Sequence, residues 1–143
     1  MKLDGSPLVA LIVEDEALLA LDMDDLLLAE GFETIRVATE EAAKAQAGRI
    51  LAVAVVDLLL ANDIAGQRII AFLRSQSPEL PIVVVTGYAH DAEQADLRGL
   101  GGPTIRLHKP AHIYQLAAAV WDVLCPEYLV AQLTHRERKE DQV

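Results

Sequence analysis

Carboxylates follow two apolar runs of the chain, each at the point where the run ends. The run Leu8–Val13 leads into the acidic residues Glu14–Glu16, and the run Ala52–Val56 leads into Asp57. Carboxylates that meet in space repel one another unless a cation lies between them. Mg²⁺ prefers oxygen ligands and supplies that charge, with Mn²⁺ as an alternative. The acids therefore predict a metal site in which one carboxylate can act as a nucleophile.

A hydroxyl group and an ammonium group follow two further apolar runs. Thr86 and Gly87 come directly after Ile82–Val85, and Lys109 stands two residues after Thr104–Leu107. Phosphoryl transfer asks mainly for positioning and for stabilisation of negative charge. A carboxylate nucleophile with a hydroxyl and an ammonium beside it therefore predicts a phosphoryl-transfer site.

An alternation of strands and helices has to bring these residues together. Short β-rich runs predict strands, and apolar residues at spacings of three and four predict helices between them. We expect strands at Leu8–Val13, Glu33–Val37, Ala52–Val56, Ile82–Val85 and Thr104–Leu107, and helices at Ala17–Glu30, Glu40–Ala47, Gln67–Ser75, Asp91–Arg98 and Ile113–Cys125. This order predicts an α/β fold, a parallel sheet with helices on both faces. Such sheets bind ligands at the carboxyl ends of their strands.

Length and charge narrow the class of protein further. The 143 residues suit one domain over 8–125, with a lead at 1–7 and an extension at 126–143 that we expect to be partly disordered. The net charge of -10 argues against direct nucleic-acid binding. No signal sequence is evident, and the apolar stretch Ile50–Ala61 is too short to span a membrane. We therefore expect a cytoplasmic protein without a membrane partner.

The remaining candidate ligands predict no second site. The lone Cys125 lies in an apolar helical context, which indicates a packed core thiol. The histidines at 90, 108, 112 and 135 lack the paired spacing of a metal site and are interpreted as surface or rim residues. The acidic run 14–16 taken alone could be solvated acids at a helix start. A carboxylate at position 57, ending a buried strand, is harder to explain without a partner.

The sequence resembles the receiver domains of response regulators in two-component signalling, over roughly Leu8 to Cys125. The resemblance rests on Glu14-Asp15, Asp57, Thr86 and Lys109-Pro110, each at the end of an expected strand. It implies a flavodoxin-like, doubly wound sheet of five parallel strands in the order 2-1-3-4-5.

The resemblance also implies a role for each matching acid. Asp57 would be the phosphoacceptor, and Asp15 and Asp57 would bind the metal directly. Glu14 would act largely through a metal-bound water, and the backbone carbonyl of Leu59 would be the other protein ligand.

The matching residues of the last two strands would complete the site. In similar proteins the lysine that matches Lys109 contacts the phosphoryl oxygens, and the peptide bond before the proline that matches Pro110 is cis. Thr86, with Gly87 beside it, would turn towards the phosphoryl group and carry the signal onward.

One position departs from the family's pattern. The family usually has an aromatic residue on the fifth strand, three residues before the lysine, and here that residue is Arg106. The run Thr86-Gly87-Tyr88 is similar to a subgroup of stand-alone receivers that lack this aromatic. We therefore expect Tyr88, and with it Arg106, at the switch surface. Strand alternation equally allows Arg106 to be an ordinary outward-facing residue opposite the inward Ile105 and Leu107.

The function that the resemblance implies is a phosphorylation-dependent switch rather than an enzyme, with only self-catalysed phosphotransfer and autodephosphorylation. The donor would be a histidine kinase or a phosphotransfer protein. A downstream protein would bind the face of the fourth helix, fifth strand and fifth helix of a monomer or weak homodimer. Two alternatives stay open: a receiver-like module that binds partners without phosphorylation, and a magnesium-dependent phosphatase. The phosphatase would usually need a second acid where Leu59 stands.

Overall fold

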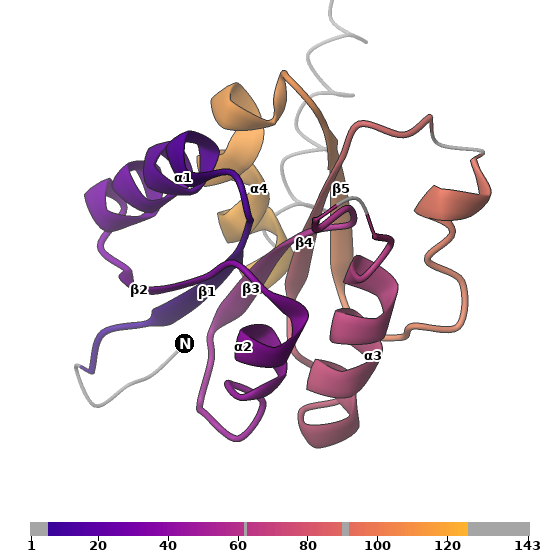
Figure 1. The fold of residues 1–143 in the computed structure, drawn as a ribbon. Helices are drawn as coiled ribbons and strands as arrows, with labels where there is room; N and C mark the ends of the chain where they lie inside the picture. The colour runs from indigo at the N-terminus through magenta and orange to yellow at the C-terminus, as the bar shows by residue number, and fades with distance from the viewer. Residues whose placement is uncertain (1–5, 62, 90–91, 126–143) are drawn as a thin grey trace, which may run out of the picture.

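The computed structural model describes residues 6–61, 63–89 and 92–125, arranged as a sheet between two layers of helices (Figure 1). The extension at 126–143, which we expected to be partly disordered, lies outside the described residues, as does most of the lead at 1–7. Within the described part of the chain, no helix is both long and apolar enough to cross a membrane.

Five parallel strands form the sheet in the order β2-β1-β3-β4-β5, which confirms the predicted fold class. Their bounds are β1 Val9–Val13, β2 Glu33–Val37, β3 Val53–Asp57, β4 Ile82–Thr86 and β5 Thr104–His108. Strands β3 and β4 are buried at every position, whereas the edge strands β2 and β5 are partly exposed. Runs that are apolar at nearly every position suit central strands, because helices cover both of their faces.

Side-chain alternation along the strands builds a separate core on each face of the sheet. Helices α1 (Ala17–Ala29) and α4 (His112–Leu124) cover one face, where Ile12, Val55 and Val85 belong to what we call the α1/α4 core. Helices α2 (Glu40–Lys44) and α3 (Gly66–Gln76) cover the other face with the α2/α3 core. The side chains of the polar residues that follow these strands continue the same alternation. Each of them therefore lies on the side of the sheet that its position in the alternation sets.

The helix expected over Asp91–Arg98 is wrong. The described part of this segment contains only η1, a 3₁₀ helix of three residues at Glu93–Ala95. Few apolar residues hold the segment against the sheet, and a helix of this length is marginal without such packing. Gly99 and Gly101 then adopt positive φ values of 82° and 67°, which end any helical path before β5.

Helix α3 begins in close contact with the loop that leaves β3. A Cβ atom at Gly66 would lie 2.5 Å from the Cα of Leu58, so only glycine allows this approach. The contact fixes the loop after Asp57 between its strand and the first turn of α3.

Cys125 at the end of α4 is a free thiol of intermediate exposure, less buried than the packed core thiol that the sequence indicates.

Candidate functional site

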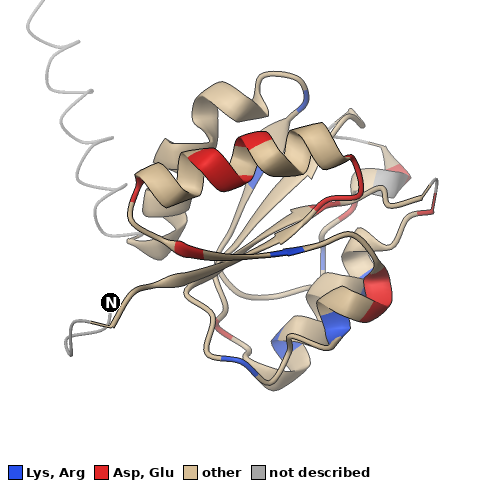
Figure 2. Cartoon of the chain, turned by 60° about the vertical axis from the view of Figure 1, so that its left-hand side comes forward, with Lys and Arg blue, Asp and Glu red and all other residues tan. Residues whose placement is uncertain are grey.

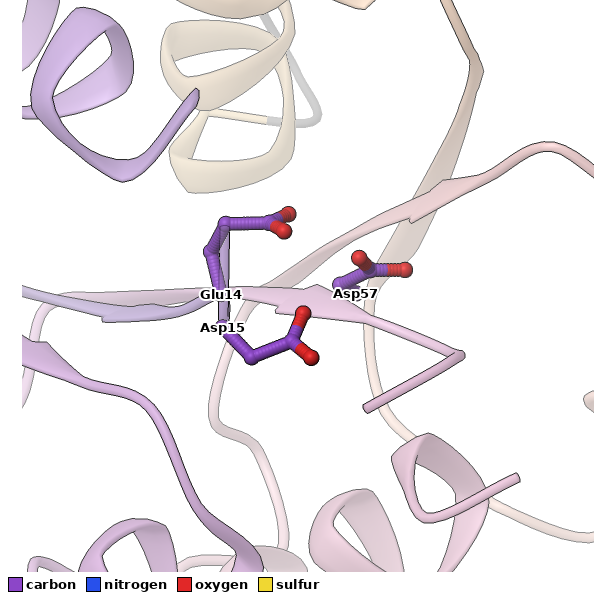
Figure 3. Close-up of side chains that lie close together, drawn as sticks. All are labelled: Glu14, Asp15 and Asp57. Atoms are coloured by element: carbon purple, nitrogen blue, oxygen red, sulfur yellow. The ribbon is translucent and has the colours of Figure 1, made fainter. Parts of the chain in front are cut away.

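Three carboxylates converge at the carboxyl edge of the sheet (Figure 3). Glu14 and Asp15 follow β1, Asp57 ends the neighbouring β3, and each offers an oxygen within 4.8 Å of those of the other two. Glu14 and Asp57 are buried, with 2% and 4% of their surface exposed, whereas Asp15 is exposed. A cavity of about 390 Å³ opens between them, and Leu59, Gly87, Tyr88 and Lys109 also line it.

Lys109 neutralises part of this negative charge. Its Nζ donates to Asp57 Oδ2 at 2.8 Å and to Glu14 Oε2 at 3.4 Å. All three side chains continue strands whose preceding alternate residues lie in the α1/α4 core, so they approach the edge from the same side. The predicted convergence of positions 14, 57 and 109 is therefore present.

Backbone N–H groups fix the orientation of the acids. Leu59 N donates to Asp57 Oδ1 at 3.1 Å, and Ala61 N donates to Asp15 Oδ2 at 2.8 Å. Ala61 has a φ of 49°, a left-handed conformation that alanine rarely adopts. The sequence gives no signal for this residue, because neither its type nor its neighbours indicate a positive φ.

Thr86 and its neighbours form the wall on the β4 side. Thr86 is buried, and its Oγ1 accepts from Tyr88 N at 2.9 Å. Its carbonyl accepts from Lys109 N at 2.8 Å, which ties the end of β4 to the end of β5. The Lys109–Pro110 peptide bond is cis.

Burial and charge repulsion perturb the acids unequally. Burial, followed by the charge of Asp57 and a hydrogen bond with it, raises the pKa of Glu14 from 4.5 to about 7, against the opposing effect of Lys109. Burial lowers the pKa of Lys109, but its hydrogen bonds and charge interactions with Asp57 and Glu14 outweigh burial and raise that pKa overall. The lysine is therefore charged at neutral pH, and the carboxyl group of Glu14 is partly protonated there.

The donor set fits a hard divalent cation. Its atoms are carboxylate oxygens, the ligands that Mg²⁺ and Ca²⁺ prefer, and a single lysine leaves an excess of negative charge among the acids. The pKa of Glu14, which is raised mainly by burial and further by the charge of Asp57, lets that carboxyl hold a proton near neutral pH. A metal ion could therefore bind here by displacing that proton.

Two residues lie in surroundings other than those expected. His112, interpreted as a surface or rim residue, is 2% exposed, because the first turn of α4 packs onto the sheet. Burial, and then the charge of Lys109, lower its pKa. Arg106 lies opposite Ile105 and Leu107 as strand alternation predicts, but it is half-buried and its Nη2 donates to the carbonyl of Ala95 at 2.6 Å.

A cation bound at this site would compete with the proton on Glu14. Between its pKa of 4.5 in an unfolded chain and about 7 in the folded protein, the folded state holds a proton that the unfolded state has lost. The contribution of Glu14 to the free energy of unfolding therefore falls as the pH rises across this window. Since a cation must displace that proton, we expect the affinity for Mg²⁺ to increase about tenfold per pH unit below pH 7 and to level off above it.

Calorimetric titration of Mg²⁺ at about pH 6 and about pH 8 measures this effect, with Glu14→Gln as the matched control. The variant has no proton to lose at this position, so its affinity should change much less between the two conditions. Equal affinities of the natural protein at both pH values would contradict the assignment.

Comparison with known proteins agrees with this arrangement. The crystal structure of a response regulator receiver protein from Sinorhizobium medicae WSM419 is 30% identical, with a TM-score of 0.72 over 83% of this chain and 95% of that one. A response regulator from Burkholderia pseudomallei, solved with a phosphorylated aspartic acid, calcium ion and citrate, is 28% identical, with a TM-score of 0.67 over 92% of this chain and 82% of that one. No family model matches the chain.

A curated relative extends the comparison to a longer protein. The probable transcriptional regulatory protein TcrX of Mycobacterium tuberculosis is 35% identical over 98 residues, or 68% of this chain. The match spans 41% of the length of that relative. The fold, the acidic edge of the sheet and these similarities together place the chain in the response regulator receiver family.

Proposed function

We propose that the chain is a phosphoacceptor switch in which Asp57 receives a phosphoryl group in the presence of Mg²⁺. The observation that carries this proposal is the contact of Lys109 Nζ with Asp57 Oδ2, at 2.8 Å, beside a cluster of three carboxylates that suits a cation. The phosphorylated aspartic acid and calcium ion of the Burkholderia pseudomallei relative support the same chemistry here. The domain that carries it extends over residues 8–125.

The transfer step needs little covalent chemistry from the protein. A carboxylate oxygen of Asp57 attacks the phosphorus, an O–P bond forms, and the bond from phosphorus to the donor breaks with its electron pair leaving on the donor atom. Bound Mg²⁺ would neutralise the acids and attract phosphoryl oxygens, and Asp15, Asp57 and the carbonyl of Leu59 would hold it, with Glu14 acting through water.

The other residues of the site orient the Asp57 carboxylate and stabilise the charge of the phosphoryl group. Leu59 N–H holds Oδ1 of Asp57, which leaves Oδ2 directed at the cavity beside Lys109. The Lys109 ammonium would then exchange its contact with Asp57 for the new phosphoryl oxygens, as a point charge suited to phosphate. The hydroxyl of Thr86, beside the exposed backbone of Gly87, would turn to the same group.

The donor we propose is a histidine kinase or a phosphotransfer protein. The output would be a changed protein-binding surface on the face of η1, β5 and α4, in which η1 stands where we expected a fourth helix. Acidic residues line α1 and the loop after β1, as Figure 2 shows, and this charge supports a protein partner over a nucleic acid.

The rival functions have less support. A phosphatase of this chemistry would use a second acid at position 59, and the leucine there contributes no proton-transferring group to the cavity. A module independent of phosphorylation would have no need for a lysine bound to two buried acids, a costly arrangement to maintain without a ligand.

Intact-protein mass spectrometry tests the proposal. After incubation with acetyl phosphate, we expect the addition of one phosphoryl group with Mg²⁺ present and none with EDTA, and peptide mapping should locate the group on Asp57. Labelling on another residue, or equal labelling without a divalent cation, would reject the proposed site.

Tyr88 provides a separate prediction about the output. Its N–H bonds to Thr86 Oγ1 and its ring packs against the α2/α3 core, so a turn of Thr86 would move it. We expect Tyr88→Ala to keep phosphorylation within about twofold but to weaken binding of the downstream partner about tenfold or more, as for an aromatic hot spot. Titration of the phosphorylated protein with a partner isolated by pull-down measures this. The idea is wrong if both phosphorylation and partner binding stay unchanged.

A further inference from the structure

Arg106 touches the segment that replaces the expected fourth helix. Its Nη2 donates to the carbonyl of Ala95 in η1 at 2.6 Å. The side chain is half-buried on the α2/α3 side of the sheet, because Ile105 and Leu107 on either side of it pack in the α1/α4 core. Arg106, which stands where the family usually has an aromatic residue, therefore contacts the η1 segment, which stands where we expected a helix.

Ala95 is the point at which this segment is anchored. Its side chain is 0% exposed in the α2/α3 core, whereas Glu93, Asp96 and Arg98 around it are exposed. The hydrogen bond from Arg106 holds the carbonyl of the same residue, so the methyl group and the backbone of Ala95 are fixed by different partners.

Most of the segment stands off the sheet. A cavity of about 530 Å³ lies between residues 92–98 and Arg106. Because few groups of the segment are packed, its position depends on a small number of contacts, and removing one of them is expected to open it locally.

The same core connects the segment to the acidic site. Tyr88 and Leu97 both pack against the α2/α3 core to which Ala95 belongs. The backbone of Tyr88 depends on Thr86, whose Oγ1 accepts its N–H at 2.9 Å. A new partner for the Thr86 hydroxyl would thus act on the α2/α3 core through Tyr88.

We propose that Arg106 is the positioning residue of the η1 segment, holding Ala95 against β5 in the resting protein so that phosphorylation of Asp57 is reported by displacement of residues 92–98. The inference rests on the proposed function for its trigger, but the resting anchor stands on the contact between Arg106 and Ala95. Arginine suits this task because its planar guanidinium presents several donors in fixed directions to backbone acceptors.

Amide hydrogen exchange tests the anchor in the full-length protein. Arg106→Met keeps an unbranched apolar side chain and removes the guanidinium donors, so we expect exchange at residues 92–98 to become on the order of tenfold faster in the resting state. Arg98→Met is the matched control, since Arg98 lies in the same segment with a side chain that is 91% exposed. Exchange in β1 and β3 should be unchanged in both variants, which confirms that each is folded.

The trigger is tested by repeating the measurement with Mg²⁺ and beryllofluoride, a mimic of an acyl phosphate. We expect the natural protein and Arg98→Met to respond at residues 92–98, and Arg106→Met to show at most a small further change because its segment is already released. Unchanged resting exchange in Arg106→Met, or a full response in it, would overturn the proposal. Absence of a response at residues 92–98 in a natural protein whose Asp57 is labelled by acetyl phosphate would overturn the trigger, and absence of that labelling would count against the proposed function instead.

Discussion

Asp57→Asn is expected to abolish phosphoryl labelling, to at least about a hundredfold below the natural protein. The amide has the shape of the carboxylate but no anionic oxygen to attack phosphorus. The fold should survive, because the amide oxygen can still accept from Leu59 N–H and Lys109 keeps its contact with Glu14. The loss would therefore come from the chemistry rather than from unfolding.

The same variant should weaken Mg²⁺ binding more than tenfold, since it removes one of three acids from a site that depends on charge. Mass spectrometry after acetyl phosphate treatment measures the first effect, and the Mg²⁺-induced rise in Tm measures the second. Asp63→Asn is the matched control, because Asp63 lies in the same loop with a side chain that is 67% exposed and paired with Arg68. Normal labelling of Asp57→Asn would remove Asp57 from its role.

Arg74→Met is expected to lower the free energy of unfolding by at least about 3 kcal/mol, because buried carbonyls would lose a charged donor. Arg74 is 6% exposed. Its guanidinium donates to the carbonyl of Leu80 at 3.1 and 3.2 Å, to that of Leu100 at 3.2 Å and to that of Pro103 at 2.7 Å. It also contacts the carbonyl of Gly101 and the hydroxyl of Thr104. A methionine would replace only the apolar stem of the arginine and would satisfy none of these acceptors.

The loop that Arg74 holds leads directly into β5 and so towards Lys109. Urea denaturation measures the loss, and Arg98→Met is again the control, with an expected change below about 0.5 kcal/mol for an exposed side chain. Arg74→Lys should recover only part of the stability, because one ammonium group cannot reach acceptors on both sides of the guanidinium. A loss below about 1 kcal/mol in Arg74→Met would mean that water replaces the arginine at little cost.

The strands were predictable because their signal is local. Each strand lies in a short run rich in apolar and β-branched residues, and the observed strands match the predicted ones to within one residue at each end. The acidic pair, Asp57, Thr86 and Lys109 follow from the same reasoning, since parallel strands deliver their next residues to one edge. The segment before β5 was mispredicted, because a short polar stretch becomes helical only where the sheet offers it packing, and Arg106 binds its backbone instead.

The sequence by itself determined the positions of the strands, the parallel sheet and the identity of the residues at its carboxyl edge, because periodicity and strand ends are properties of neighbouring residues. Only the tertiary structure decided how those residues are held. The left-handed Ala61 that binds Asp15, the buried His112 and the contacts of Arg74 and Arg106 join positions far apart in the chain. Such contacts depend on burial and on the direction of single donor groups, and neither can be inferred from local residue types.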